Sequence, residues 1–280
     1  MRTQSLTLAI TTLLATLITA TNAHEFWIQT SRVSTAQGPK LEIKLMHGHR
    51  FDGHPLLTDE PQIHRFEIVH APDDSTDIPY AHRQSVTHAD AHDTGIIVYE
   101  SNLYRSNLSA ERFEAYLKEE HLDHVIADRA LKNETNKEGR ELYARCSKSI
   151  LSPEDPSKTS ASIHTIDHAV GLPLEIIIES IQIADNHTNS ADEPDPIHHT
   201  VTARVLHNGS PAADLRTVAT SSADPDTLLE LTTDSDGRIE FQTDLSSEWM
   251  ITTLHIKRLT ERQSEQTDAD WISYWSSITF

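Results

Sequence analysis

Cysteine and glycine are scarce in this 280-residue chain, which contains one cysteine and eight glycines. A single cysteine cannot close an intramolecular disulfide, build a cysteine-rich zinc site or ligate an iron–sulfur cluster. Positive charge is also scarce, since 23 Lys and Arg stand against 43 Asp and Glu to give a net charge of −20. This excess argues against nucleic acid and anionic membrane surfaces as partners, because both would be repelled. Neutral or cationic partners remain, and any metal chemistry must use histidines and carboxylates.

The first 23 residues have the pattern of an export signal. Met1-Arg2 is a short positive start, residues 6–18 are apolar and Thr-rich, and small residues lead up to Ala23. We expect cleavage after Ala23. The alternative, a membrane anchor, is disfavoured because a spanning helix needs about 20 apolar residues. The sequence therefore predicts a soluble exported protein with no stable membrane insertion after cleavage, and the lack of disulfides is consistent with a bacterial periplasm.

The mature chain divides into two β-rich halves with different patterns. In the first half, predicted as a domain over 24–168, apolar and charged residues alternate along 40–46, which is typical of a half-buried strand. One helix is predicted over 109–128, with Ser109 as its N-cap, because apolar residues recur there at helical spacing. The segment 138–151 fits neither period cleanly.

The second half, predicted as a domain over 169–280, has β patterns only. Short β-branched segments are separated by the turn signals Asn208-Gly209 and Asp236-Gly237. Strands at this spacing indicate antiparallel sheets packed as an immunoglobulin-like β-sandwich. The predicted fold class is therefore mainly β: an N-terminal β-rich domain with one helical insertion, followed by the sandwich.

The new N-terminus carries the most chemical content. Cleavage after Ala23 makes His24 the first residue, so its free amine and its imidazole can chelate one ion together. Nickel, cobalt, copper and zinc ions suit such nitrogen donors. A histidine from elsewhere in the chain would complete a three-nitrogen brace. The alternative is that His24 only follows a cleavage site, because most histidines bind no metal.

Three further histidines are candidate ligands. His47 and His49 flank Gly48 at a strand end, where glycine can let both turn toward one ion. His255 lies in an otherwise apolar strand, where a buried imidazole needs a hydrogen bond or a metal. The open alternatives are a solvated His-rich loop over 47–54 and a core histidine that is satisfied without an ion.

Other reactive groups carry little signal. His121 and His124, three residues apart on the predicted helix, and the pair Glu119-Glu120 are interpreted as solvated helix surface. Cys146 is expected to be a buried structural thiol. The sequence has no nucleophile elbow and no glycine-rich phosphate loop, so no catalytic residue is assigned and a non-enzymatic role is preferred.

Seven short stretches of the chain agree in order and spacing with a known family. They are residues 23–28, 48–55, 111–117, 139–148, 171–175, 233–238 and 270–280. Over nearly the whole mature chain the sequence resembles the exported bacterial family called domain of unknown function 4198. The resemblance implies an N-terminal β domain, a C-terminal immunoglobulin-like domain and a link to periplasmic components of nickel or cobalt uptake. It also implies interest in His24 and His255, which match family positions, whereas the chain departs from the family pattern at His49 and His54.

Together these patterns predict a periplasmic protein that binds a divalent transition metal ion, Ni(II), Co(II) or Cu(II), in metal uptake or homeostasis. The expected ligands are His24, His255 and one of His47 or His49, and the acidic surface would attract cations. The ion is the expected partner, with a membrane metal transporter as a possible recipient. Two alternatives stay open: a non-enzymatic sandwich module that binds a protein or a glycan without metal, and a copper-dependent oxidase with an N-terminal His brace.

Overall fold

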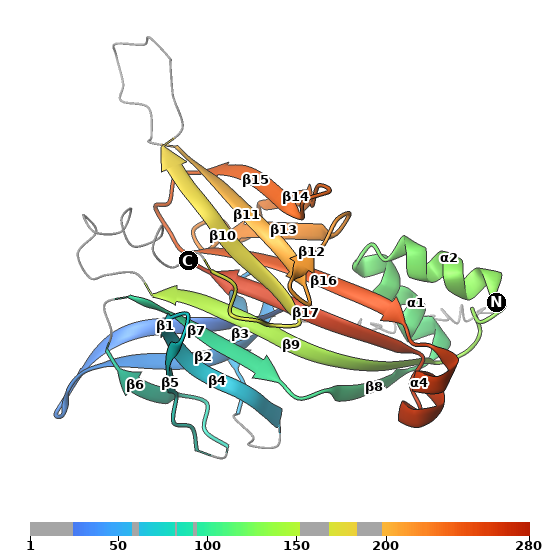
Figure 1. Cartoon of the computed structure of the whole chain (residues 1–280), viewed down its shortest axis with the longest axis horizontal. Helices are drawn as coiled ribbons and strands as arrows, with labels where there is room; N and C mark the ends of the chain where they lie inside the picture. The colour runs from blue at the N-terminus through green and yellow to red at the C-terminus, as the bar shows by residue number, and fades with distance from the viewer. Residues whose placement is uncertain (1–24, 58–61, 82, 92–93, 152–167, 184–197) are drawn as a thin grey trace, which may run out of the picture.

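The computed structural model describes most of the chain from Glu25 onward (Figure 1). The described residues are 25–57, 62–81, 83–91, 94–151, 168–183 and 198–280. They form three β-sheets and three helices, so the predicted mainly β class is confirmed. The predicted export signal and His24 lie outside the described residues.

The N-terminal half begins with a four-stranded antiparallel sheet. Its strands are β1 (Glu25–Thr35), β2 (Gly38–His49), β3 (Asp52–Pro55) and β6 (Thr87–Asp90). The predicted alternation along 40–46 is confirmed, because Leu41, Ile43 and Leu45 are buried while the charged residues between them remain partly exposed. This buried face packs against β4 and β7 of a second, larger sheet.

The larger sheet has nine strands and runs through both halves of the chain. Its strands in spatial order are β14 (Leu228–Thr232), β13 (Arg216–Ser221), β16 (Trp249–Arg258), β17 (Trp271–Thr279), β9 (Gly139–Leu151), β7 (Gly95–Ser101), β4 (Ile63–Ala71) and β5 (Asp74–Asp77), with β8 (Tyr104–Leu108) also paired to β9. β17 pairs with β9 in parallel, and the other pairs described in this sheet are antiparallel. The halves of the chain before and after residue 168 form two separate hydrophobic cores, and the nine-stranded sheet is continuous across both.

The segment 138–151, which fits neither helical nor strand periodicity, forms β9 at the centre of this sheet. Its burial alternates poorly because both of its faces are covered, as expected of a central strand. Leu151 belongs to the core formed with the first sheet, whereas the neighbouring Ile150 packs on the core of the C-terminal sandwich. Because adjacent strand residues point to opposite faces, the two smaller sheets cover opposite faces of the nine-stranded sheet.

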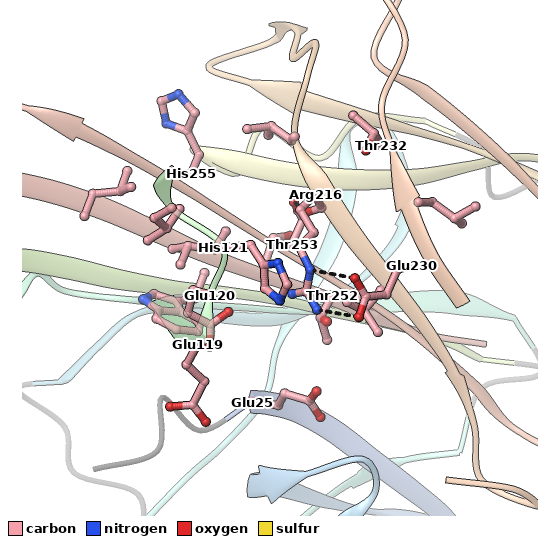
Figure 2. A pocket seen from close by; sticks show the side chains of 18 of the residues that line it. Glu25, Glu119, Glu120, His121, Arg216, Glu230, Thr232, Thr252, Thr253 and His255 are labelled. Carbon is pink, nitrogen blue, oxygen red and sulfur yellow. Dashed lines mark hydrogen bonds and ion pairs between the residues drawn. The ribbon is translucent and has the colours of Figure 1, made fainter. Parts of the chain in front are cut away.

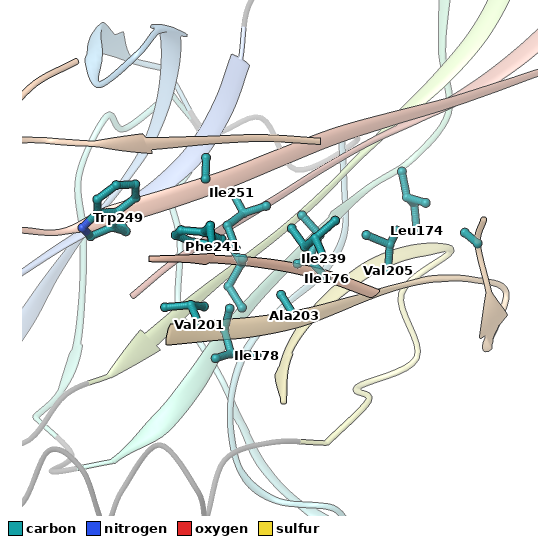
Figure 3. Close-up of a cluster of buried hydrophobic side chains, with 13 residues drawn as sticks. Leu174, Ile176, Ile178, Val201, Ala203, Val205, Ile239, Phe241, Trp249 and Ile251 are labelled. Carbon is teal, nitrogen blue, oxygen red and sulfur yellow. The ribbon is translucent and has the colours of Figure 1, made fainter. Parts of the chain in front are cut away.

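The third sheet completes the C-terminal sandwich. Its strands are β10 (Leu174–Ile183), β11 (His199–His207), β12 (Ser210–Pro211) and β15 (Arg238–Thr243). Their inward side chains, among them Ile176, Val205 and Phe241, meet Ile251 of β16 in one core (Figure 3). The Asn208-Gly209 signal lies at the β11–β12 turn with φ of 50° and 76°, so the predicted turn and β-sandwich are both confirmed.

A buried ion pair ties β9 to β10, and therefore the long sheet to the third sheet. Lys148 Nζ lies 2.9 Å from Glu175 Oε1, and both side chains are only 2% exposed. The same carboxylate accepts backbone N–H bonds from Val170, Gly171 and Leu172 at 2.7, 3.0 and 3.2 Å. The charge of Glu175 is thus balanced by one ammonium and three amide dipoles, which a buried carboxylate requires.

The prediction of one helix over 109–128 is wrong in one respect, because this part of the chain forms two helices. α1 (Ala110–Glu119) begins at the predicted N-cap, where Ser109 Oγ accepts from the Arg112 amide at 3.4 Å. α2 (Asp123–Leu131) follows after a short turn. The apolar periodicity continues through the turn, so periodicity alone does not reveal the break.

The break is a Schellman motif centred on His121. This residue has φ of 57°, its amide donates to Lys118 O at 3.2 Å, and the Leu122 amide donates to Leu117 O at 2.8 Å. Such bonding satisfies the last carbonyls of α1 and ends the helix. Buried Leu117 and Leu122 hold the turn against the protein.

A further helix, α4 (Glu261–Thr267), was not anticipated. Its capping box joins Thr260 and Gln263, a pattern that the sequence already contains. None of the helices in the described part of the chain has both the length and the apolarity that crossing a membrane requires.

Candidate functional site

A cavity of about 900 Å³ opens where the N-terminal sheet, the α1–α2 turn and the β14 edge of the long sheet meet (Figure 2). Its lining comes from the start of β1, the end of β2, the turn between the two helices, and strands β13, β14, β16 and β17. These segments are far apart in the sequence, and the cavity exists only because the nine-stranded sheet brings both halves of the chain together.

The N-terminal wall is set by the β1–β2 register. Glu25, the first described residue, pairs with Gly48, and its Oε2 accepts from the Arg50 amide at 2.6 Å. Arg50 and Phe51 have φ of 52° and 64°, so the β2–β3 connection is a tight turn that β3 follows back along β2. A Cβ at Gly48 would lie 2.1 Å from Asp52 O, so glycine is required for this close approach.

Carboxylates from separate segments gather at this end of the cavity. Burial raises the pKa of Glu120 to about 7; Arg216 opposes that rise, while Glu119 and Glu25 add to it. Burial also raises the pKa of Glu25, against the opposing effects of the Arg50 amide and of His49. Glu25 and Glu120 therefore interact electrostatically although they lie far apart in the sequence.

The sheet wall holds a paired arginine. Arg216 of β13 contacts Glu230 of β14 through two nitrogen–oxygen contacts of 3.3 and 3.2 Å (Figure 2). Arg216 lowers the pKa of Glu230, and His121 contributes in the same direction. Among the described residues that line the cavity, five carboxyl groups face two arginines, so negative charge stays in excess even when Glu120 is protonated.

His255 lies at the other end of the cavity from Glu25 (Figure 2). Its ring packs against that of His207, tilted by 32° with 4.1 Å between the ring centroids, and its buried Nδ1 has no hydrogen-bond partner among the described residues. The pKa of His255 is lowered to about 4, mainly by burial and, in decreasing order, by His207, Lys257 and His124. The imidazole is therefore neutral at pH 7, the form that can donate a lone pair.

The structure gathers the predicted ligands only in part. His49 and His255 line the same cavity, whereas His47 is not among the lining residues and its ring lies edge-on to His54, 5.7 Å between centroids. His24 lies outside the described residues. Within the described ranges, no group of three or more His, Cys, Asp or Glu side chains is arranged to hold an ion.

The α1–α2 turn is the part of the site that the sequence interpretation missed. Glu119, Glu120, His121 and His124 were expected on a solvated helix face, but all four line the cavity. Their placement follows from the helix break at His121, which periodicity does not report. The expectation for Cys146 is confirmed: the thiol is buried, and burial raises its pKa to about 12, so it is unsuited to nucleophilic chemistry.

Comparison with known proteins gives one finding. The profile of a family described as domain of unknown function (DUF4198) matches residues 21–257. This range begins before the predicted cleavage site and includes the cavity-lining residues up to Ile256. No curated protein and no solved structure matches the chain significantly.

Proposed function

The chain belongs to the DUF4198 family, and from this premise we propose that the mature protein binds a divalent transition metal ion at its N-terminus. In this proposal export to the periplasm removes residues 1–23, and the ion, Ni(II), Co(II) or Cu(II), is held for uptake or homeostasis and passed to a membrane transporter. The protein acts as a carrier and not as an enzyme.

The observation that carries the proposal is the position of Glu25. It lines the cavity at the very start of β1. Adjacent Cα atoms are about 3.8 Å apart, so the amine and imidazole of His24 begin one residue from the cavity wall. His49 lines the same wall and interacts electrostatically with Glu25, so we propose it as the third nitrogen ligand.

The charges of the cavity fit a cation. The charge of Glu25 adds to the rise in the pKa of Glu120, and a divalent ion nearby would relieve that repulsion. Imidazole nitrogen, amine nitrogen and carboxylate oxygen together suit borderline first-row ions. The excess of negative charge would also concentrate cations at the opening.

The other two predicted ligands have less support. His255 lies at the far end of the cavity beside His207, and His47 is turned toward His54. We therefore propose His24 and His49 as the primary set, with His255 and His47 as secondary candidates.

The test compares mature protein beginning at His24 with a His24→Ala variant in calorimetric titrations with Ni(II) and Cu(II). Loss of a bidentate amine–imidazole chelate should weaken binding at least tenfold. A form with one extra alanine before His24 keeps the imidazole but displaces the amine, and it should be weakened similarly. His64→Ala, at an exposed residue of β4 outside the cavity lining, is the matched control and should bind as the parent does.

Equal titration curves for the parent and His24→Ala would refute the N-terminal site. Mass spectrometry of the protein exported from cells tests the premise on processing, with His24 expected as the first residue. A different first residue would remove the free amine on which the chelate depends.

A further inference from the structure

The sheet wall of the cavity includes an apolar patch. Val218 of β13 lies opposite Thr252 of β16, and Leu254, two residues further along β16, lies opposite Trp275 of β17. Paired residues share a face of a sheet, and so do residues two apart on one strand, so these four residues lie on the same face. All four line the cavity, and we call them its floor. The floor offers a ligand apolar surface and one hydroxyl group.

Trp275 gives the floor an aromatic ring. This ring stacks on that of buried Tyr116, with 6.0 Å between ring centroids and 25° between ring planes, while Trp275 itself stays partly exposed. The face of a tryptophan ring attracts a cation within about 6 Å of its centre, more strongly than the rings of tyrosine or phenylalanine do. The floor is therefore suited to a molecule that carries both carbon atoms and positive charge.

Carboxyl groups without a described counter-ion stand beside the floor. Glu119 and Glu120, at the end of α1, line the cavity, and among the described residues no ion pair neutralises either of them. Arg216 of the sheet wall is engaged by Glu230 through two contacts. Half-buried carboxylates gain most from a donor that brings positive charge, because such charge-assisted hydrogen bonds are about twice as strong as neutral ones.

The balance of charge in the lining fits a ligand with two positive charges. Five carboxyl groups and two arginines line the cavity, so when Glu120 is protonated and the histidines are neutral, the four remaining carboxylates exceed the arginines by two. The carboxyl groups are also spread out, since Glu230 is the register partner of Val218 on β14, whereas Glu120 comes from the α1–α2 turn. A primary ammonium group can donate three hydrogen bonds to such acceptors.

We propose that the cavity binds an aliphatic diamine, with its carbon chain on the floor and its ammonium groups at the carboxylates. The cavity volume of about 900 Å³ falls in the ~300–1,000 Å³ range of pockets that hold organic ligands. None of the groups that recognise the diamine is His24 or another histidine. This site is therefore independent of the proposed metal site, although the two share one cavity.

The test is a calorimetric titration of the chain beginning at His24, with 1,6-diaminohexane as the probe. Hexylamine, 1,6-hexanediol and adipate have the same six-carbon chain with one positive charge, no charge and two negative charges. We expect one diamine to bind per chain and hexylamine to bind about tenfold more weakly, a difference of about 1.4 kcal/mol. The diol and adipate should give no binding heat.

A double variant tests the carboxylates. Glu119→Gln combined with Glu120→Gln removes two charges from the cavity and should weaken diamine binding about tenfold or more. Glu111→Gln combined with Glu138→Gln removes two exposed charges outside the cavity lining, so it is the matched control and should bind as the parent does.

A second variant tests the floor. Thr252→Lys places an ammonium group on the floor itself, where it would occupy the position of the ligand, and should abolish diamine binding. Thr227→Lys, at an exposed residue that does not line the cavity, is the matched control and should leave diamine binding unchanged.

Several outcomes would overturn this inference: hexanediol, adipate or hexylamine bound as tightly as the diamine, no binding of the diamine, or equal losses in a cavity variant and its control. The His24→Ala variant separates the inference from the proposed function, because it should lose nickel binding and keep diamine binding. If His24→Ala lost diamine binding as well, the diamine site would depend on the N-terminus and the inference would be wrong. Failure of the parent to bind nickel would overturn only the proposed function.

Discussion

The β9–β10 junction and the cavity both withdraw charged side chains from water, and the two regions are built differently. At the junction of β9 and β10, Glu175 receives the ammonium of Lys148 and three backbone N–H bonds, so the junction supplies its own counter-charge. In the cavity, Glu25 and Glu120 come from separate segments, and the charge of Glu25 adds to the rise in the pKa of Glu120. A charge that is balanced within the fold serves structure, whereas charges that repel one another at a cavity wall favour a cationic ligand.

The largest effect is expected at the junction. Lys148→Met removes the ammonium and leaves a buried carboxylate with neutral donors only, so the free energy of unfolding should fall by about 3 kcal/mol. Urea denaturation at pH 7 measures this change. Lys118→Met, which breaks the exposed Lys118–Glu114 pair, is the matched control and should cost less than about 0.5 kcal/mol. If Lys148→Met and Lys118→Met lowered the free energy of unfolding by similar amounts, the buried ion pair would not stabilise the fold more than the exposed one.

Glu141 provides the next test, because it is a buried carboxyl outside the cavity lining. Burial raises its pKa to about 7, against the hydrogen bonds from Ser273 and Tyr116. Since the folded pKa lies above the unfolded value, the stabilising contribution is complete below about pH 4.5 and is lost as pH rises through 7.

Glu141→Gln keeps an oxygen acceptor for both hydroxyl groups and cannot ionise. It should therefore raise the free energy of unfolding by about 2 kcal/mol at pH 8 and change little at pH 4. Urea midpoints at the two pH values measure the difference. An equal change in the urea midpoint at both pH values would show that ionisation of Glu141 does not cause the change in stability.

Glu120→Gln should behave differently, although burial raises the pKa of Glu120 to about 7 as well. At pH 8 we expect Glu120→Gln to raise the free energy of unfolding by about 1 kcal/mol, less than Glu141→Gln, because the Glu120 side chain is only half-buried. Removing a negative charge from the cavity should at the same time weaken nickel binding several-fold. Glu141→Gln, measured in the same titration, should leave nickel binding unchanged, and equal effects on binding would contradict the cavity assignment.

The smallest effect is expected at His255. Because its folded pKa of about 4 lies below the ordinary 6.5, its stabilising contribution is present above pH 6.5 and is lost as pH falls toward 4. The facing groups His207, Lys257 and His124 all disfavour the charged form. Between pH 7 and pH 4.5, the free energy of unfolding of His255→Gln should fall by about 1 kcal/mol less than that of the parent. This figure is kept small because the His255 side chain is partly exposed to solvent.

Urea denaturation at pH 7 and pH 4.5 measures the acid sensitivity of the His255→Gln variant. His64→Gln, at an exposed histidine, is the control and should follow the parent. If His255→Gln followed the parent too, protonation of His255 would not contribute to acid destabilisation.

The strands with one covered face were predictable, and the strand with two covered faces was not. Along 40–46 the alternation of apolar and charged residues reports a half-buried strand directly. β9 gives no such pattern, because its neighbouring side chains meet different cores on opposite faces. The helix break at His121 was missed for a related reason: a left-handed residue changes the chain direction without interrupting the apolar periodicity.

The residues of the candidate site were likewise only partly predictable from local sequence patterns. His49 and His255 could be selected from the sequence because each stands out from its neighbours. Glu119 and Glu120 could not, because on a helix such a pair is normally solvated. Only packing of the α1–α2 turn near β13 and β14 gives these carboxylates a cavity to line.

The sequence by itself determined the β class, the N-cap at Ser109, the turn at Asn208-Gly209 and the acidic charge, since each depends on residues close together in the chain. The tertiary structure alone decided the parallel pairing of β17 with β9, the continuous sheet and the cavity. Local patterns report which side of an element is apolar, but they do not specify the partner that covers it. That choice depends on contacts between segments more than one hundred residues apart, such as Trp271 beside Glu141.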